Sequence, residues 1–135
     1  MLRSLKLRQF RCFDSLVIEP GPGASMFVGE NAQGKTSILE SVCVLLRLQS
    51  PRTSTVGELV KFETSGFGIE GELGEARLGF TYTPSGKKRM LVDGEAQRRR
   101  GDYLANSGLV VWMANDDLIL VRGGGDPRRR YLDFI

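Results

Sequence analysis

The fold of this chain is decided by one stretch in its first third, Gly29-Glu30-Asn31-Ala32-Gln33-Gly34-Lys35-Thr36. It fits the phosphate-binding loop, or P-loop, pattern G-x-x-x-x-G-K-[ST]. The two glycines let the backbone curl so tightly that successive N–H groups face inward and form a nest for an anion. Lys35 then reaches the β- and γ-phosphates, and the Thr36 hydroxyl can ligate Mg²⁺. The pattern predicts a nucleoside triphosphate site.

The segments on either side of the loop favour the same interpretation. An apolar run at 25–28 predicts a strand, and apolar residues at helical spacing predict a helix from Lys35 to about Leu48. The dipole of that helix points its positive end at the phosphates. Strand, glycine loop and helix in this order are the context that the pattern requires. The alternative, a glycine turn that carries Lys and Thr by chance, lacks this context.

Composition narrows the function classes. The chain has 135 residues, of which 41% are hydrophobic and 26% are charged, with a net charge of +3. It contains no histidine, so imidazole zinc sites and Ser–His catalysis are excluded. Two cysteines, Cys12 and Cys43, are too few for a disulfide scaffold and are interpreted as reduced packing thiols. Without an apolar stretch of membrane-spanning length or a signal-peptide core, we expect a cytoplasmic protein with no membrane contact.

The basic residues are unusual because arginine dominates. The sequence contains 14 Arg against 5 Lys, with triplets at 98–100 and 128–130. The planar guanidinium group suits phosphate. For either triplet alone, a solvated helix face remains the alternative.

The hydrophobic patterns predict one domain over 1–135 with three successive parts. The first part, 1–50, carries an antiparallel strand pair (2–10 and 16–18), the P-loop and its helix. The second part, 51–97, forms a three-stranded antiparallel meander (67–73, 76–82, 87–92) packed beside the nucleotide-binding sheet. Residues 98–135 carry a short helix or loop (98–104), a buried strand (109–113), a turn capped by Asn115 and a helix that starts at Asp126-Pro127. That last helix has no terminator, so we expect a piece of a longer protein, truncated at its C-terminus.

The sequence offers only weak candidates for the aspartate that holds Mg²⁺ in hydrolytic P-loop enzymes. Asp93 follows the apolar run 90–92 but precedes Gly94, which indicates a hairpin turn. Asp116 and Asp117 follow the run 110–113 after two intervening residues, and helix capping is the alternative for both. We therefore expect the chain to bind a nucleotide without hydrolysing it alone.

Taken together, these segments resemble RecF, the bacterial replication and recombination-repair ATPase family related to SMC proteins and ABC-type heads. The residues that carry the resemblance, in chain order, are 5–11, 29–41, 52–53 with 58–60, 91–94, and 118–123 with 129–133. The resemblance implies an α/β fold of the P-loop NTPase class. Its form would be lobe I of an ABC/SMC-like ATPase head, with a mixed sheet around one P-loop helix plus the antiparallel β-meander.

The resemblance also implies a mechanism. RecF-like heads bind ATP and Mg²⁺, dimerise around ATP, and bind single-stranded, gapped or junction DNA in replication, recombinational repair and the SOS response, together with recombination mediator proteins. Their signature motif and catalytic acids lie in a C-terminal half that this sequence does not contain. Carried over by position, Gly29 through Thr36 bind phosphate, Thr36 binds the metal, and Arg11 lies near the nucleotide.

One departure and two alternatives stay open at this stage. Ala32 stands where glycine is common, which is harmless only with a negative φ. A monomeric small-molecule kinase or other NTPase is one alternative; such enzymes usually alternate parallel strands with helices, which the meander argues against. A non-catalytic ATP-gated interaction module is the other.

Overall fold

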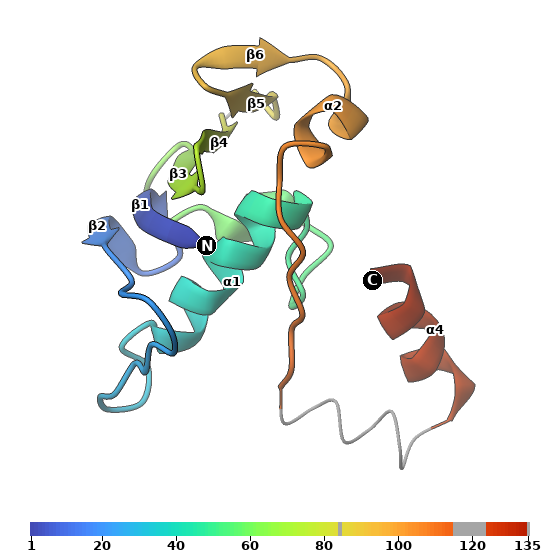
Figure 1. Ribbon diagram of the computed structural model, residues 1–135. Helices are drawn as coiled ribbons and strands as arrows, with labels where there is room; N and C mark the ends of the chain where they lie inside the picture. The colour runs from blue at the N-terminus through green and yellow to red at the C-terminus, as the bar shows by residue number, and fades with distance from the viewer. Residues whose placement is uncertain (84, 115–123, 135) are drawn as a thin grey trace.

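A six-stranded antiparallel sheet forms the larger part of the structure, a computed structural model that describes residues 1–83, 85–114 and 124–134 (Figure 1). The strand order is β2-β1-β3-β4-β5-β6, and every neighbouring pair is antiparallel. The strands are β1 (Leu2–Phe10), β2 (Phe13–Ile18), β3 (Phe67–Leu73), β4 (Ala76–Tyr82), β5 (Lys88–Val92) and β6 (Glu95–Gln97).

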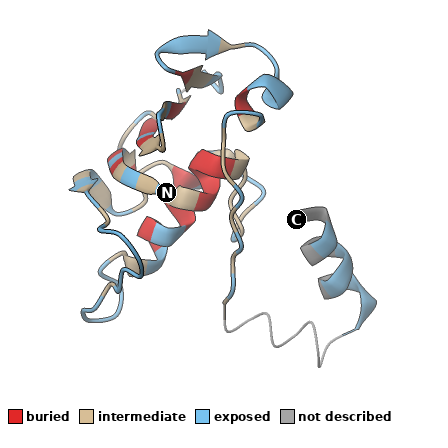
Figure 2. Ribbon diagram, viewed as in Figure 1, coloured by how far each residue is buried: buried red, intermediate tan, exposed pale blue. Residues whose placement is uncertain are grey.

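Helix α1 (Lys35–Arg47) covers one face of this sheet. Period-two alternation places apolar side chains on that face, so Leu5, Leu7 and Ile69 are almost fully buried. Leu45 packs so closely on β3 that a Cβ at Gly71 would lie 2.7 Å from its Cδ2. Figure 2 shows the buried residues concentrated on α1 and the strands it faces.

Three shorter elements complete the described chain. They are the 3-10 helix η1 (Val56–Leu59), α2 (Arg100–Leu104) and α4 (Gly125–Phe134). The hydroxyl of the fully buried Tyr103 donates a hydrogen bond of 2.7 Å to the Leu45 carbonyl, which fixes α2 to the C-terminal part of α1. Among the described helices, none is both long and apolar enough to cross a bilayer.

Most of the predicted elements are confirmed. The first strand pair, the P-loop helix, the three strands of the meander and the short helix after the first arginine triplet all form. The last helix begins at Gly125, next to the predicted Asp126-Pro127 start. The meander does not pack beside another sheet, however. It continues the first strand pair, because β1 is hydrogen-bonded to both β2 and β3, and the described sheet is antiparallel throughout and not the mixed sheet expected.

Two strand predictions are wrong for the described structure. Residues 25–28 and 109–113 adopt no strand, and neither segment has a hydrogen-bonded neighbouring strand. Their side chains alternate instead of being buried on both faces: Val28 is 84% and Leu109 97% exposed, whereas Phe27 and Val110 pack against the core. An apolar run predicts burial, but a strand also needs a partner for its backbone groups. The predicted capped turn at 115–118 lies outside the described residues.

The Tyr103–Leu45 contact gives the first testable prediction. Tyr103→Phe keeps the buried ring but leaves the Leu45 carbonyl without this donor, so we expect the free energy of unfolding to fall by about 1 kcal/mol. Urea denaturation of wild type and variant measures this change in the free energy of unfolding. Tyr82→Phe is the matched control, because Tyr82 stacks on Phe67 through its ring alone. Equal losses in both variants would contradict this role of the hydroxyl.

Candidate functional site

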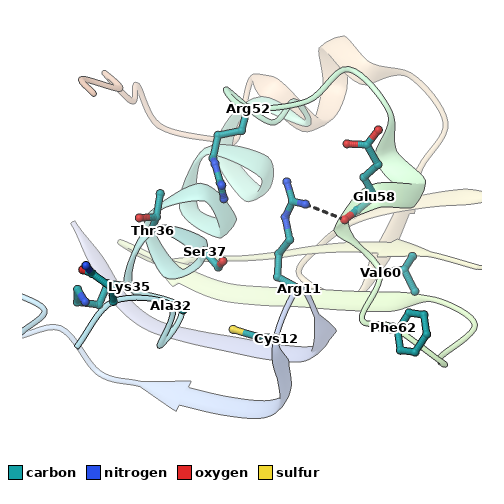
Figure 3. A pocket seen from close by; sticks show the side chains of 12 residues that line it. Arg11, Cys12, Ala32, Lys35, Thr36, Ser37, Arg52, Glu58, Val60 and Phe62 are labelled. Carbon is teal, nitrogen blue, oxygen red and sulfur yellow. Dashed lines mark hydrogen bonds between the residues drawn. The ribbon is translucent and has the colours of Figure 1, made fainter. Parts of the chain in front are cut away.

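A pocket of about 650 Å³ opens at the N-terminal end of α1 (Figure 3). This volume is in the range of small-molecule sites, roughly 300–1,000 Å³. Three chain segments form its wall: the turn between β1 and β2, the P-loop with the first turn of α1, and the segment from 52 to 62. The lining residues are Arg11, Cys12, Asn31, Ala32, Gly34, Lys35, Thr36, Ser37, Arg52, Glu58, Val60 and Phe62.

The structure brings most of the predicted site residues together in this pocket. Arg11 and five P-loop residues line it, namely Asn31, Ala32, Gly34, Lys35 and Thr36. Gly29, Glu30 and Gln33 lie in the same loop but outside the lining. Gly29 and Glu30 take part through their carbonyls: the Lys35 ammonium donates to both, at 2.8 Å to Gly29. The ammonium is thus already held within the loop, with its charge at the pocket.

The first turn of α1 is open to an anion. Its N-cap is Gly34, which has φ 87° and no side chain to accept a hydrogen bond from the first amides. The first turn also contains no acidic residue. Backbone donors and the positive end of the helix dipole are therefore unopposed by any local side chain, which is the arrangement that binds phosphate at helix N-termini.

Gly34 also marks the contact between the P-loop and the β1–β2 turn. A Cβ at this position would lie 2.5 Å from the Phe13 ring and 2.6 Å from the Cys12 sulfur. Glycine is required here for two reasons: the backbone has a left-handed φ, and the neighbouring side chains leave no room for a Cβ. The position of the loop thus depends on the turn that carries Arg11.

Arg11 is held by a buried carboxylate. Its guanidinium donates two hydrogen bonds to Glu40 on α1, at 2.9 Å from Nε and 2.7 Å from Nη2, and a third at 2.9 Å to the Glu58 carbonyl. Glu40 is fully buried. Its two oxygens also accept from the Ser50 hydroxyl at 2.6 Å and from Arg52 at 3.2 Å.

The electrostatics of this cluster favour a bound anion. Burial by itself would raise the pKa of Glu40, but hydrogen bonds from Arg11 and Ser50 and the charges of Arg11 and Arg52 together hold that pKa below its ordinary value of 4.5. Glu40 is therefore an anion at neutral pH, balanced by two arginines. Among the described residues, three cations at the pocket wall, Arg11, Lys35 and Arg52, stand against two carboxylates, Glu40 and Glu58, which leaves one positive charge in excess.

The opposite end of the pocket is apolar. Phe62 and Val60 lie at the end remote from Lys35 (Figure 3). Phe62 is 84% exposed, although a large aromatic ring gains by burial. The pocket therefore runs from a cationic end at the P-loop to an apolar end at 60–62.

Ala32 adopts the conformation that the sequence left open. Its φ is +66°, in the left-handed region that disfavours residues with a Cβ. The departure from glycine is therefore not harmless, and the loop carries local backbone strain.

The described part of the chain offers few side chains that could bind a metal ion at this site. Thr36 is exposed at the start of α1 and lines the pocket, as an Mg²⁺ ligand must. No group of three or more Cys, Asp or Glu side chains there could hold a metal ion. Asp93 belongs to the predicted hairpin turn, since its carboxylate accepts from the Arg77 amide at 2.7 Å. Asp116 and Asp117 lie outside the described residues.

The sequence patterns did not identify several residues of this site, among them Glu40, Ser50, Arg52 and Phe62. Of these four, only one carried a usable signal in the sequence. Glu40 is a charged residue among the apolar positions of the P-loop helix, which indicates a buried and paired carboxylate. The others reach the site through tertiary packing of the segment after α1.

Comparison with known proteins agrees with this geometry. The sequence matches the AAA domain family over residues 4–118. It is 38% identical to the DNA replication and repair protein RecF of an Exiguobacterium species, over 98% of this chain and 36% of that protein. It is 37% identical to RecF of Staphylococcus carnosus, with the same coverage of both chains. This chain thus spans about a third of the length of these relatives.

Solved structures show the same fold. The recombination mediator protein RecF with ATP superposes with a TM-score of 0.87 at 31% identity, over 98% of this chain and 36% of that one. An SMC ATPase structure superposes at 0.77 over 98% of both chains, with 17% identity, and shares the fold alone. The predicted resemblance and the predicted fold class, an ATPase head lobe of the ABC/SMC-like type, are confirmed.

The strain at Ala32 gives a second prediction. Ala32→Gly removes a left-handed conformation that costs about 1–2 kcal/mol for residues with a Cβ, partly offset by the entropy of glycine. We expect a net gain of roughly 0.5–1 kcal/mol in the free energy of unfolding. Ala105→Gly is the control with opposite sign, because Ala105 has φ −62°. A loss of stability in both variants would contradict the strain.

The third prediction concerns Glu40. Glu40→Gln is nearly isosteric but removes the charge that balances Arg11 and Arg52, so we expect a loss of roughly 3 kcal/mol at pH 7. The folded-state pKa is lowered, so the carboxylate stabilises above its unfolded-state value near 4.5, and this stabilisation is lost as pH falls through the folded-state pKa.

Denaturation of both proteins between pH 7 and pH 3 measures the effect. The gap between wild type and Glu40→Gln should narrow below pH 4.5, whereas Glu72→Gln, in an exposed pair with Arg77, should change stability by less than about 0.5 kcal/mol. If the difference in the free energy of unfolding between wild type and Glu40→Gln did not change with pH, the assignment of a charged Glu40 would be contradicted.

Proposed function

Since this chain belongs to the AAA domain family and is of the RecF type, we propose that it supplies the ATP-binding lobe of a protein acting in DNA replication and repair. The observation that carries the proposal is the uncapped N-terminus of α1, which faces a pocket with a net excess of positive charge. Residues 1–135 are interpreted as a single lobe. The activity itself belongs to the whole protein. The relatives are about three times as long as this chain.

The proposed binding mode follows the polarity of the pocket. The phosphates lie in the loop Gly29–Thr36, with Lys35 at the β- and γ-phosphates and Mg²⁺ on the Thr36 hydroxyl. Arg11 lies beside the phosphate chain from the β1–β2 turn. The base lies at the apolar end, where the exposed ring of Phe62 can stack on it.

This lobe binds ATP and depends on further residues for hydrolysis. The P-loop, Lys35 and Thr36 supply binding and metal contacts. Of the two described carboxylates at the pocket, Glu40 is engaged by Arg11, Ser50 and Arg52, and Glu58 lies on the side of Val60 and Phe62, away from Lys35 (Figure 3). We propose that the site is completed in an ATP-dependent homodimer, which binds single-stranded, gapped or junction DNA in the cytoplasm. Recombination mediator proteins would be its partners, and the SOS response its context.

The kinase alternative is less well supported. A small-molecule kinase is expected to alternate parallel strands with helices, and the described sheet is antiparallel throughout. A non-catalytic ATP-gated interaction module differs from the proposed function only in its partner, so it remains an outcome of the test below.

The test is DNA binding with and without ATP over a salt series, for wild type and Lys35→Ala. We expect ATP to tighten binding at least ten-fold in wild type and to have no effect in Lys35→Ala, because the phosphates lose their cation. Binding should weaken steeply with salt as phosphate contacts release counterions.

Fluorescence anisotropy of a labelled gapped duplex measures the affinity. Arg3→Ala is the control, since Arg3 is exposed on β1 and does not line the pocket. A DNA affinity that is the same with and without ATP would contradict the proposed function. Nucleotide binding without any DNA binding at low salt would favour the interaction module.

A further inference from the structure

Five exposed basic residues lie at the β6 edge of the sheet, remote from the nucleotide pocket. Three lie in sequence at the start of β5 and two follow the end of β6: Lys87, Lys88, Arg89, Arg98 and Arg99. We call them the β5–β6 basic cluster. Figure 1 shows this hairpin at the end of the sheet away from β2 and the P-loop.

The strand register brings the two halves of the cluster together. Met90 pairs with Gln97 across the β5–β6 ladder, so the next residues along the two strands are Arg89 and Arg98. Like charges at neighbouring positions of adjacent strands repel one another. The hairpin therefore concentrates cations where its own stability gains nothing from them.

The residues that the structure describes provide no paired counter-charge for the cluster. Within the described part of the chain, none of the five side chains forms an ion pair or a hydrogen bond. Some cations elsewhere on the described surface are paired with carboxylates: Lys61 with Asp14, and Arg77 with Glu72 at 3.0 Å. Arg3 and Lys6 on β1 are also exposed and unpaired, so the cluster is set apart by the number of unpaired cations that the hairpin brings together.

The arginine triplet is also held in place. Arg100, its third member, donates a hydrogen bond of 2.9 Å to the Arg47 carbonyl at the C-terminal end of α1. Tyr103 fixes the same helix to Leu45. Arg98 and Arg99 are therefore presented from an anchored segment, which lowers the entropy lost when they bind a ligand.

From this placement we propose that the β5–β6 basic cluster binds the phosphate backbone of duplex DNA. The inference rests on the proposed function and adds the surface through which the protein contacts DNA. Phosphate is the anion that arrays of Lys and Arg recognise, and such contacts position a duplex without reading its sequence. Binding of single strands usually also uses exposed aromatic rings, and the one such ring on the described surface, Phe62, lies at the nucleotide pocket.

The test compares two variants with equal loss of charge. The first carries Lys88→Gln, Arg89→Gln, Arg98→Gln and Arg99→Gln; the second carries Arg3→Gln, Lys6→Gln, Arg77→Gln and Arg129→Gln, all exposed and outside the cluster. Anisotropy of a labelled blunt duplex is measured from 25 to 300 mM salt, on the order of the range in which phosphate contacts dominate. ATP binding is measured in parallel as a control for folding.

We expect the cluster variant to bind duplex at least ten-fold more weakly, with a log K against log salt slope shallower by about 3–4, and to keep its ATP affinity. The control variant should change far less. Equal losses in both variants would mean that affinity follows net charge and would overturn the inference. Retention of duplex binding by the cluster variant would overturn it as well, leaving the proposed function intact. Failure of the wild type to bind DNA at all would overturn both.

Discussion

The buried carboxylate of Glu40 is the interaction on which the rest of the site depends. It lies on the P-loop helix and binds Arg11 from the β1–β2 turn and Ser50 and Arg52 from the segment after α1. Three separate segments of the chain thus meet on one group. A buried ion of this kind is stable only while its hydrogen bonds are complete, and no described buried side-chain polar atom lacks a partner. The network therefore fixes the relative positions of the walls of the pocket.

The P-loop is consequently one part of a shared structure. Its closing glycine touches Phe13 and Cys12, its lysine is held by its own loop carbonyls, and its helix carries the carboxylate that orients Arg11. The other end of the same helix holds α2 and the arginine triplet through Arg100 and Tyr103. A single rigid element thus has the nucleotide pocket at one end and the anchor of the basic cluster at the other.

Sequence patterns predicted what depends on local chemistry. The glycine loop, the helix after it, the alternating strands and the Asp93-Gly94 hairpin follow from residue type and spacing, and the structure contains each of them. Patterns failed where the answer lies in pairing between distant segments. Residues 25–28 and 109–113 are apolar but have no neighbouring strand, and the pairing of β1 with β3 was not encoded near either strand. Arg52 and Phe62 entered the site for the same reason.

The central claim is that the pocket at the start of α1 recognises the phosphate chain of a nucleoside triphosphate. Calorimetric titration of the protein with ATP, ADP and AMP in the presence of Mg²⁺ tests it most directly. We expect tight and comparable binding of ATP and ADP and at least a hundred-fold weaker binding of AMP, on the order of the 3 kcal/mol supplied by charged hydrogen bonds to the β-phosphate. Equal affinity for AMP, or no binding of ATP, would contradict it.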